Sequence, residues 1–164
     1  EDNKAIIGNG MPKMFAALQA NYRWKGLDVS VSFRGAFGFD ILNAYRMKYE
    51  TLAWLSSFNV PKSAYQKVGE YYNFAPSIYS DRYIESGDYV KLDNLTIGYT
   101  FDLSQRNKVI RSIRVFCTGM NLLTISGYSG LDPEVAIVGL TPGVDPINKY
   151  PNLRSYIVGA SFNF

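Results

Sequence analysis

Residues 155–164 read SYIVGASFNF, and their pattern decides the fold. One set of alternate side chains is apolar, while the set between them is small or polar apart from Ile157; the apolar set is Tyr156, Val158, Ala160, Phe162 and Phe164. A period of two predicts a β-strand with one apolar and one polar face. The apolar face of such a strand needs a partner surface, which the rest of the sequence must explain.

Four further segments alternate in the same way, namely residues 14–24, 27–35, 89–101 and 111–123. Lys25-Gly26 separates the first two segments and predicts a hairpin turn. In residues 89–101 the first half is out of phase with the second. Either a β-bulge near Asp93 or departure of the strand from the apolar layer explains the slip.

Long and short connections alternate along the chain. Two residues join the first pair of strands and residues 102–110 the second pair, whereas residues 36–88 and 124–152 are far longer than ordinary hairpin loops. Strands of about ten residues with one apolar face, joined in this manner, are typical of outer-membrane β-barrels. We therefore expect an all-β fold: a transmembrane antiparallel β-barrel segment of five strands with two long extracellular loops, whose apolar face meets lipid.

Aromatic residues gather at the predicted short-turn ends of these strands. An aromatic girdle at one membrane interface is expected there, formed by Tyr22, Trp24, Tyr99, Phe101, Phe162 and Phe164. The alternative is a soluble β-sandwich, in which Val29, Val31, Ile97 and Val158 pack in a protein core.

Composition excludes several classes of function. The sequence holds no His and one Cys, so histidine-based catalytic triads, histidine metal sites and an internal disulfide framework are absent. The formal charge of +3 comes from scattered residues, which argues against nucleic-acid binding. Because five strands cannot close a membrane barrel, we expect residues 1–164 to be the C-terminal part of a larger one, and the lack of a signal-peptide pattern in EDNKAIIGNGM fits.

Three ordered motifs carry a family resemblance: GDYVKLDNLTIGYTF, RVFCTGMNLLTISGYSGLDPEV and GVDPINKYPNLRSYIVGASFNF. Together with IIGNGMPKMFAALQANYRWKGLDVSVSFRGAFGFDILN they resemble the C-terminal region of the SusC/RagA family of TonB-linked outer-membrane transporters. Met120 departs from the family, which usually has a polar residue there, and residues 36–88 are not recognisable in detail.

The resemblance implies an importer of oligosaccharides or peptides with no catalytic residue, cofactor or metal. Its partners would be a SusD-like lipoprotein, TonB acting through a plug outside this chain, the barrel-assembly machinery, outer-membrane lipid and a second SusC–SusD pair. It further implies the outer membrane of a Gram-negative bacterium, with extracellular loops and the C-terminus at the periplasmic rim. An outer-membrane enzyme and a purely structural or adhesive barrel are the alternatives.

Candidate contact residues follow from the two faces and the loops. The lumen side is predicted to carry Asp28, Arg34, Asn94, Arg114 and Asn163, which contact plug or solute or are solvated wall residues. Loop contacts to ligand or lid are predicted for Tyr128, Asp132, Glu134, Tyr71 and Tyr72, with a turn-forming role as the alternative for the first three. Phe164 is a girdle residue, a terminal signal for barrel assembly, or both.

The loop of residues 36–88 is rich in aromatic residues, including Trp54, Tyr65, Tyr71, Tyr72, Phe74 and Tyr79. Exposed rings would suit a glycan or a protein partner. A compact loop that buries its own rings, around a short helix over residues 45–55, is the other interpretation.

Overall fold

The computed structural model describes residues 4–66, 79–104, 109–137 and 139–164, and its chain forms two compact units. The strand unit comprises Phe15–Ala36, Tyr89–Ile125 and Asn152–Phe164. The loop unit comprises Glu1–Met14, Phe37–Asp88 and Ser126–Pro151. The long connections predicted from the sequence therefore form a folded unit of their own.

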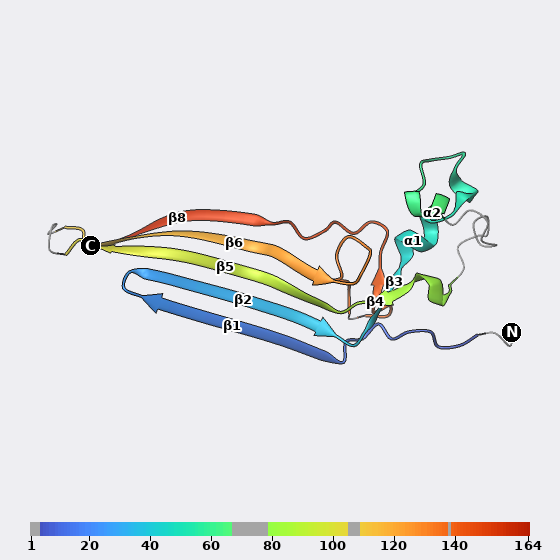
Figure 1. The fold of residues 1–164 in the computed structure, drawn as a ribbon, viewed down its shortest axis with the longest axis horizontal. Helices are drawn as coiled ribbons and strands as arrows, with labels where there is room; N and C mark the ends of the chain where they lie inside the picture. Colours follow the sequence, from blue (N-terminus) through green and yellow to red (C-terminus); the bar gives the residue numbers. More distant parts are fainter. Residues whose placement is uncertain (1–3, 67–78, 105–108, 138) are drawn as a thin grey trace. The chain divides into compact units, whose positions relative to one another are not determined.

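The strand unit is built on one five-stranded sheet in the order β1-β2-β5-β6-β8 (Figure 1). Its strands are β1 (Met14–Trp24), β2 (Leu27–Phe37), β5 (Tyr89–Asp102), β6 (Ser112–Ser126) and β8 (Ser155–Asn163). β2 pairs with β5, and β6 with β8, in the antiparallel sense. The all-β antiparallel fold predicted from the alternating segments is confirmed, and each strand contains most of its predicted residues.

A β-bulge at Asp93 accounts for the change of phase in β5. Ser32 lies opposite Asn94 and Phe33 opposite Leu92, so Asp93 is the extra residue. A bulge of this kind shifts the alternation by one position, so that Val90 and Leu92 share a face with Leu95 and Ile97. Of the two explanations left open by the sequence, the bulge is the one observed.

The register gives the sheet two chemically different faces. The apolar face carries pairs such as Val29 opposite Ile97 and Cys117 opposite Val158. The polar face carries pairs such as Ser30 opposite Thr96 and Arg114 opposite Ser161. We call these the apolar face and the polar face below.

In the described residues the apolar face does not pack into a protein core. Ile97 is 48% exposed and Val158 is 75% exposed, and all eleven residues of β1 are exposed. A soluble sandwich would bury these side chains. The strands are also 9 to 15 residues long, enough for the roughly 9 to 11 residues that a tilted membrane strand requires.

A second irregularity lies in β6 at Asn121, whose φ of 53° is in the left-handed region that Asn tolerates better than most residues. A Cβ on Gly119 would lie 2.7 Å from the Leu122 side chain, so these two positions share a face. The alternation of β6 therefore changes phase at Asn121. The Asn121 side chain also donates a hydrogen bond to the Leu153 carbonyl, at 3.1 Å.

The loop unit contains a small three-stranded sheet in the order β4-β3-β7. Its strands are β3 (Asp40–Asn43), β4 (Ile84–Ser86) and β7 (Val144–Asp145), and β3 pairs with β7 in the parallel sense. Apart from Ala36 of the strand unit, the buried hydrophobic residues of the described chain lie in this unit: Phe39, Ile41, Ala44, Ala64, Tyr83, Tyr128 and Val135.

Short helices complete the loop unit: α1 (Ala44–Tyr49), α2 (Lys62–Gln66) and the 3-10 turns Leu52–Trp54 and Asp81–Tyr83. Asn43 caps α1 by accepting a hydrogen bond from the Arg46 amide at 3.0 Å. The helix predicted over residues 45–55 is interrupted, because Thr51 adopts an extended conformation and caps the following 3-10 turn. In the described part of the chain, no helix is long and apolar enough to cross a membrane.

Candidate functional site

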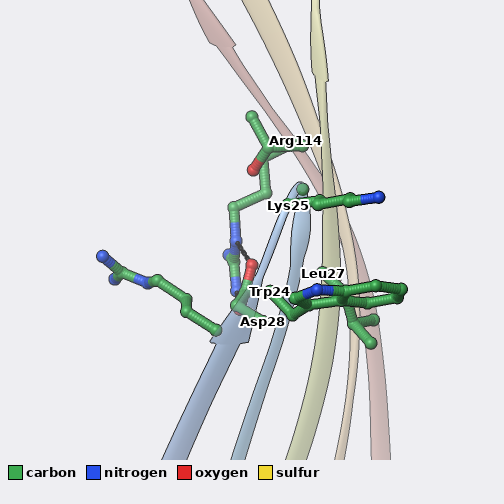
Figure 2. A pocket seen from close by; sticks show the side chains of 8 residues that line it. Trp24, Lys25, Leu27, Asp28 and Arg114 are labelled. Atoms are coloured by element: carbon green, nitrogen blue, oxygen red, sulfur yellow. Dashed lines mark hydrogen bonds and ion pairs between the residues drawn. The ribbon is translucent and has the colours of Figure 1, made fainter.

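A cluster on the polar face is built around Arg114 of β6. Its Nε and Nη2 donate to Oδ1 and Oδ2 of Asp28 at 2.9 Å and 2.5 Å, a bidentate ion pair. Figure 2 shows the two side chains meeting. Bidentate pairs fix the guanidinium plane more firmly than a single hydrogen bond does. We call Asp28, Arg114 and Phe116 the Arg114 cluster.

Two glycines make room for this cluster. Asp28 lies on β2 and Arg114 on β6, so the pair spans the intervening strand β5. A Cβ on Gly98 of β5 would lie 2.6 Å from Arg114 Nη2 and 2.7 Å from Asp28 Oδ1. Only glycine leaves that space open, since any larger residue would displace the pair.

The aromatic ring of Phe116 supports the other side of Arg114. The guanidinium carbon lies 4.9 Å from the ring centroid, within the range of a cation–π contact. Gly159 of β8 lies opposite Phe116, and a Cβ there would come within 2.5 Å of the ring. Side chains of β2 and β6 thus form the Arg114 cluster, and glycines of β5 and β8 leave room for it. The ion pair and the Phe116 ring together orient the Arg114 guanidinium.

A cavity of about 350 Å³ adjoins the Arg114 cluster at the hairpin between β1 and β2. It is lined by Arg23, Trp24, Lys25, Gly26, Leu27, Asp28, Thr100 and Arg114. In Figure 2 the Trp24 and Leu27 side chains extend to the opposite side from Asp28. Lys25 Nζ lies 4.9 Å from the centroid of the Trp24 ring.

Two other polar-face residues predicted from the sequence, Arg34 and Asn94, form hydrogen bonds within the wall. Arg34 Nε donates to Asp93 Oδ1 at 2.9 Å, so the bulged residue supplies its partner. Asn94 accepts a hydrogen bond from Thr96, whose hydroxyl also lies 2.8 Å from that of Thr118. Asn163 lies opposite Ser112 in the strand register at the end of the sheet. These residues share a face, but only Asp28 and Arg114 come together.

The six aromatic residues predicted to form a girdle lie near the short-turn end of the sheet, where Figure 1 also shows the C-terminus. All are exposed by between 46% and 72%, and Tyr99 and Phe101 contact each other with centroids 4.8 Å apart. The structure thus gathers these rings at one end of the strands. Whether they meet a membrane interface stays a prediction.

In the loop unit, the carboxylate of Glu85 organises a polar network. It accepts hydrogen bonds from Arg46 Nη1 at 2.6 Å, from the Ser129 amide and hydroxyl at 2.7 and 2.8 Å, and from Asn43 at 3.1 Å. Burial alone would raise the pKa of Glu85, but these donors together lower it below its ordinary value of 4.5. Arg46 also pairs with Glu50 at 2.9 Å, so the network joins three separate segments of the chain.

The predicted loop-contact residues Tyr128, Asp132 and Glu134 take part in the folding of the loop unit. Tyr128 is buried and donates to Asp145 at 2.5 Å; burial, this hydrogen bond and the nearby acids raise its pKa. Asp132 is buried and accepts from the Glu134 amide at 3.0 Å, a turn contact. Lys149 Nζ donates to the Asp132 and Glu134 carbonyls. Tyr71 and Tyr72, like Phe74, lie outside the described residues.

A second cavity, of about 300 Å³, lies beside these residues and is lined by Tyr45, Ser129, Gly130, Leu131, Asp145, Pro146, Ile147 and Lys149. In the same unit, the Trp54 ring stacks on Phe58 with centroids 5.6 Å apart, and Tyr49 meets Phe58 edge-on. Trp54, Tyr65 and Tyr79 nevertheless stay exposed. The described part of the loop thus has both ring contacts and exposed rings, and a role of these rings in binding a glycan or a partner stays a prediction.

Sequence reasoning missed Arg23, Phe116 and the Glu85 network. Gly98 and Gly159, in the middle of strands, were a signal that a large side chain crosses there. Glu85 and Arg46 gave no signal, because their proximity depends on the fold of the loop unit. In the described residues, no group of three or more Cys, Asp or Glu side chains could hold a metal ion.

Comparisons with known proteins agree with the fold. No protein-family model matches the chain. Over 99% of its length the chain is 26% identical to TonB-dependent receptor P3 of Formosa agariphila and 27% identical to TonB-dependent receptor SusC of Bacteroides thetaiotaomicron. It spans about one sixth of these relatives, 17% and 16% of their lengths.

Among solved structures, the chain is similar to the RagAB peptide transporter, with a TM-score of 0.72 and 24% identity over 94% of this chain and 17% of that one. The closed-closed state of the RagAB peptide importer gives a TM-score of 0.74 over 97% of this chain and 18% of that one. These structures support the fold. Together the comparisons confirm what the sequence motifs predicted: over nearly its whole length, this chain resembles part of the SusC/RagA kind of TonB-dependent receptor.

Proposed function

We propose that residues 1–164 form the C-terminal part of the barrel wall of a TonB-dependent outer-membrane importer. The observation that carries the proposal is the uncovered apolar face: alternate positions along the five strands present apolar side chains that the described chain does not bury. Water does not stabilise such a surface, whereas lipid does. The resemblance to TonB-dependent receptors over 99% of the chain points the same way.

The edges of the sheet support the same proposal. β1 and β8 each have one neighbour in the described sheet, which leaves a row of backbone groups on either side. Backbone groups at a lipid-exposed edge must be paired, so strands from the rest of the protein would continue the sheet from both edges and close it. The plug, which would contact TonB, would be supplied by the same longer chain.

The proposed orientation rests on the alternation of short and long connections, which is typical of outer-membrane barrels. The short turns β1–β2 and β5–β6 would lie at the periplasmic rim together with Phe164, and the loop unit on the extracellular side. The loop unit, with exposed aromatic residues such as Trp54 and Tyr79, would meet a SusD-like lipoprotein or the solute. A second SusC–SusD pair completes the expected assembly.

The proposed solute is an oligosaccharide or a peptide, carried without chemical change. RagAB is described as a peptide importer, and the family resemblance implies oligosaccharides as the other class, so both classes belong in the test. The gene for the full-length protein is deleted in its native bacterium, and uptake of labelled peptides and labelled oligosaccharides is measured. Loss of one uptake, restored by the wild-type gene and abolished by a protonophore, would support the proposal.

Unchanged uptake of both classes would count against it. In that case the purified full-length protein is assayed for ester and peptide hydrolysis, which tests the enzymatic alternative. A barrel that neither transports nor hydrolyses would leave the structural or adhesive role.

A further inference from the structure

The cavity beside the Arg114 cluster has an excess of positive charge. On the side of Asp28, the lining residues Arg23 and Arg114 are cationic and Asp28 is anionic, so two positive charges minus one negative charge leave +1. Lys25 extends to the side of Trp24, away from Asp28 (Figure 2). Asp28 is already engaged by Arg114 in the bidentate pair. Lys25 lies over the Trp24 ring. Among the described lining residues on this side, Arg23 is the cation without an ion pair, so it can meet an incoming group.

The position of Arg23 follows from the hairpin. β1 ends at Trp24 and β2 begins at Leu27, so a two-residue turn joins them and Arg23 lies across from Asp28, on the polar face. The Gly26 carbonyl accepts from the Thr100 amide at 2.8 Å, which ties the turn to the end of β5. Arg23 and Arg114 thus flank one carboxylate on a wall fixed by backbone hydrogen bonds.

Such a site has a defined ligand chemistry. Arginine presents planar donors that match a carboxylate in a bidentate manner, and a preorganised guanidinium loses little freedom on binding. Arg114 is preorganised by Asp28 and by the Phe116 ring. Thr100 adds a hydroxyl to the lining. A planar anion of three or four heavy atoms fits easily within about 350 Å³.

From this geometry we infer that the cavity lined by Arg23, Thr100 and Arg114 binds a second carboxylate on the polar face of the wall. The inference rests on the proposed barrel, in which this face is the lumen. The carboxylate then comes either from an Asp or Glu of a protein segment inside the barrel or from a free solute. Both sources present the same group, a carboxylate, and the experiment below distinguishes between them.

The test uses Arg23→Lys in the full-length protein, because a lysine amine keeps the charge and can be cross-linked. A water-soluble carbodiimide activates a carboxylate, and the amine at position 23 then displaces the activating group to form an amide. The reaction is run in buffer without carboxylates, and again with isotope-labelled succinate at matched ionic strength. Mass spectrometry identifies the linked peptide or the succinyl adduct.

The matched control is Arg111→Lys, an exposed cation just before β6 that does not line the cavity. We expect the lysine at position 23 to form a link to a carboxylate other than Asp28, with a yield about tenfold above that of the lysine at position 111. One charge-assisted hydrogen bond would give a factor of this size. A link to an Asp or Glu of the protein, formed without succinate, identifies a protein segment. A link to succinate alone identifies a solute.

Links to Asp28 only, or yields equal to those of Arg111→Lys, would overturn the inference, since the cavity would then hold only water. Such a result would leave the barrel proposal standing, because that proposal depends on the opposite face of the sheet. Folding of the variant is checked by its heat-modifiable mobility, and Arg23→Gln should fold equally well because it leaves the Asp28–Arg114 pair in place.

Discussion

A charge placed on the apolar face near the middle of β8 tests the assignment of that face. Val158 is the fourth of nine residues in β8, lies opposite Cys117 and is 75% exposed. Val158→Lys would hold an ammonium group in the hydrocarbon region if this face meets lipid. The neighbouring substitution Ile157→Lys is the matched control, because Ile157 lies opposite Thr118 on the polar face.

The magnitude follows from the depth of the residue. A lysine at the bilayer midplane of a barrel destabilises it by roughly 2 to 4 kcal/mol. Ser155 lies three residues away, roughly 10 Å along the strand, so partial snorkelling toward the interface brings the expected cost to about 2 to 3 kcal/mol. That is roughly a 30-fold to 150-fold change in the folding equilibrium. For Ile157→Lys we expect less than about 1 kcal/mol, because its ammonium remains hydrated.

The assay measures urea unfolding of the full-length protein in lipid vesicles, with heat-modifiable mobility as the readout of folded barrel. Ser161→Lys is a weaker control than Ile157→Lys, because Ser161 lies opposite Arg114 and a second cation there is repelled. Equal destabilisation by Val158→Lys and Ile157→Lys would refute the reasoning, because it would mean that both faces have the same surroundings.

Four further outcomes are expected. Gly98→Val should displace the Asp28–Arg114 pair and lower barrel stability by about 1 to 3 kcal/mol, measured by the same unfolding assay; an unchanged midpoint would contradict the packing described. Deletion of Phe164 should reduce folded barrel in the membrane fraction, whereas normal yield would remove its role in assembly or in the girdle. Glu85→Ala should leave Arg46 with Glu50 as a remaining partner but remove the acceptor for Ser129 and Asn43, and so lower the local opening free energy of the loop unit, measured by amide exchange, by about 1 to 3 kcal/mol; unchanged exchange would contradict the network. Folding lowers the pKa of Glu85 below 4.5, so its stabilisation is present above that value and is lost as the pH falls through the folded pKa. Acid should therefore destabilise the loop unit of the wild type more than the loop unit of Glu85→Gln. Equal acid sensitivity of the two proteins would speak against this.

The five long strands could be predicted because each carries its own signal. Alternation with a period of two is a local property of the sequence. Residues 27–35 and 155–164 could therefore be predicted as strands without knowing which strands lie beside them in the sheet. The phase change in β5 was also visible, although choosing the bulge at Asp93 required the register with β2. The fold of the sheet was thus largely contained in short windows of sequence.

The Arg114 cluster could not be predicted, because it depends on which residues face each other across three strands. Asp28 and Arg114 are 86 positions apart in the sequence, and only the combined registers bring them over Gly98. The Glu85 network is similar, since Arg46 and Ser129 reach it from segments 39 and 44 positions away. Contacts of this kind arise from tertiary packing, and local sequence patterns carry no information about them.

The central claim is that the apolar face of the sheet meets lipid while the polar face meets water. Nitroxide labels are placed singly at residues 156–160 of β8 in the full-length protein, after Cys117→Ser, and reconstituted in liposomes. We predict oxygen accessibility highest at Tyr156, Val158 and Ala160, and accessibility to a water-soluble nickel complex highest at Ile157 and Gly159, so that the two profiles alternate out of phase. Profiles that rise and fall together, or show no period of two, would contradict the account.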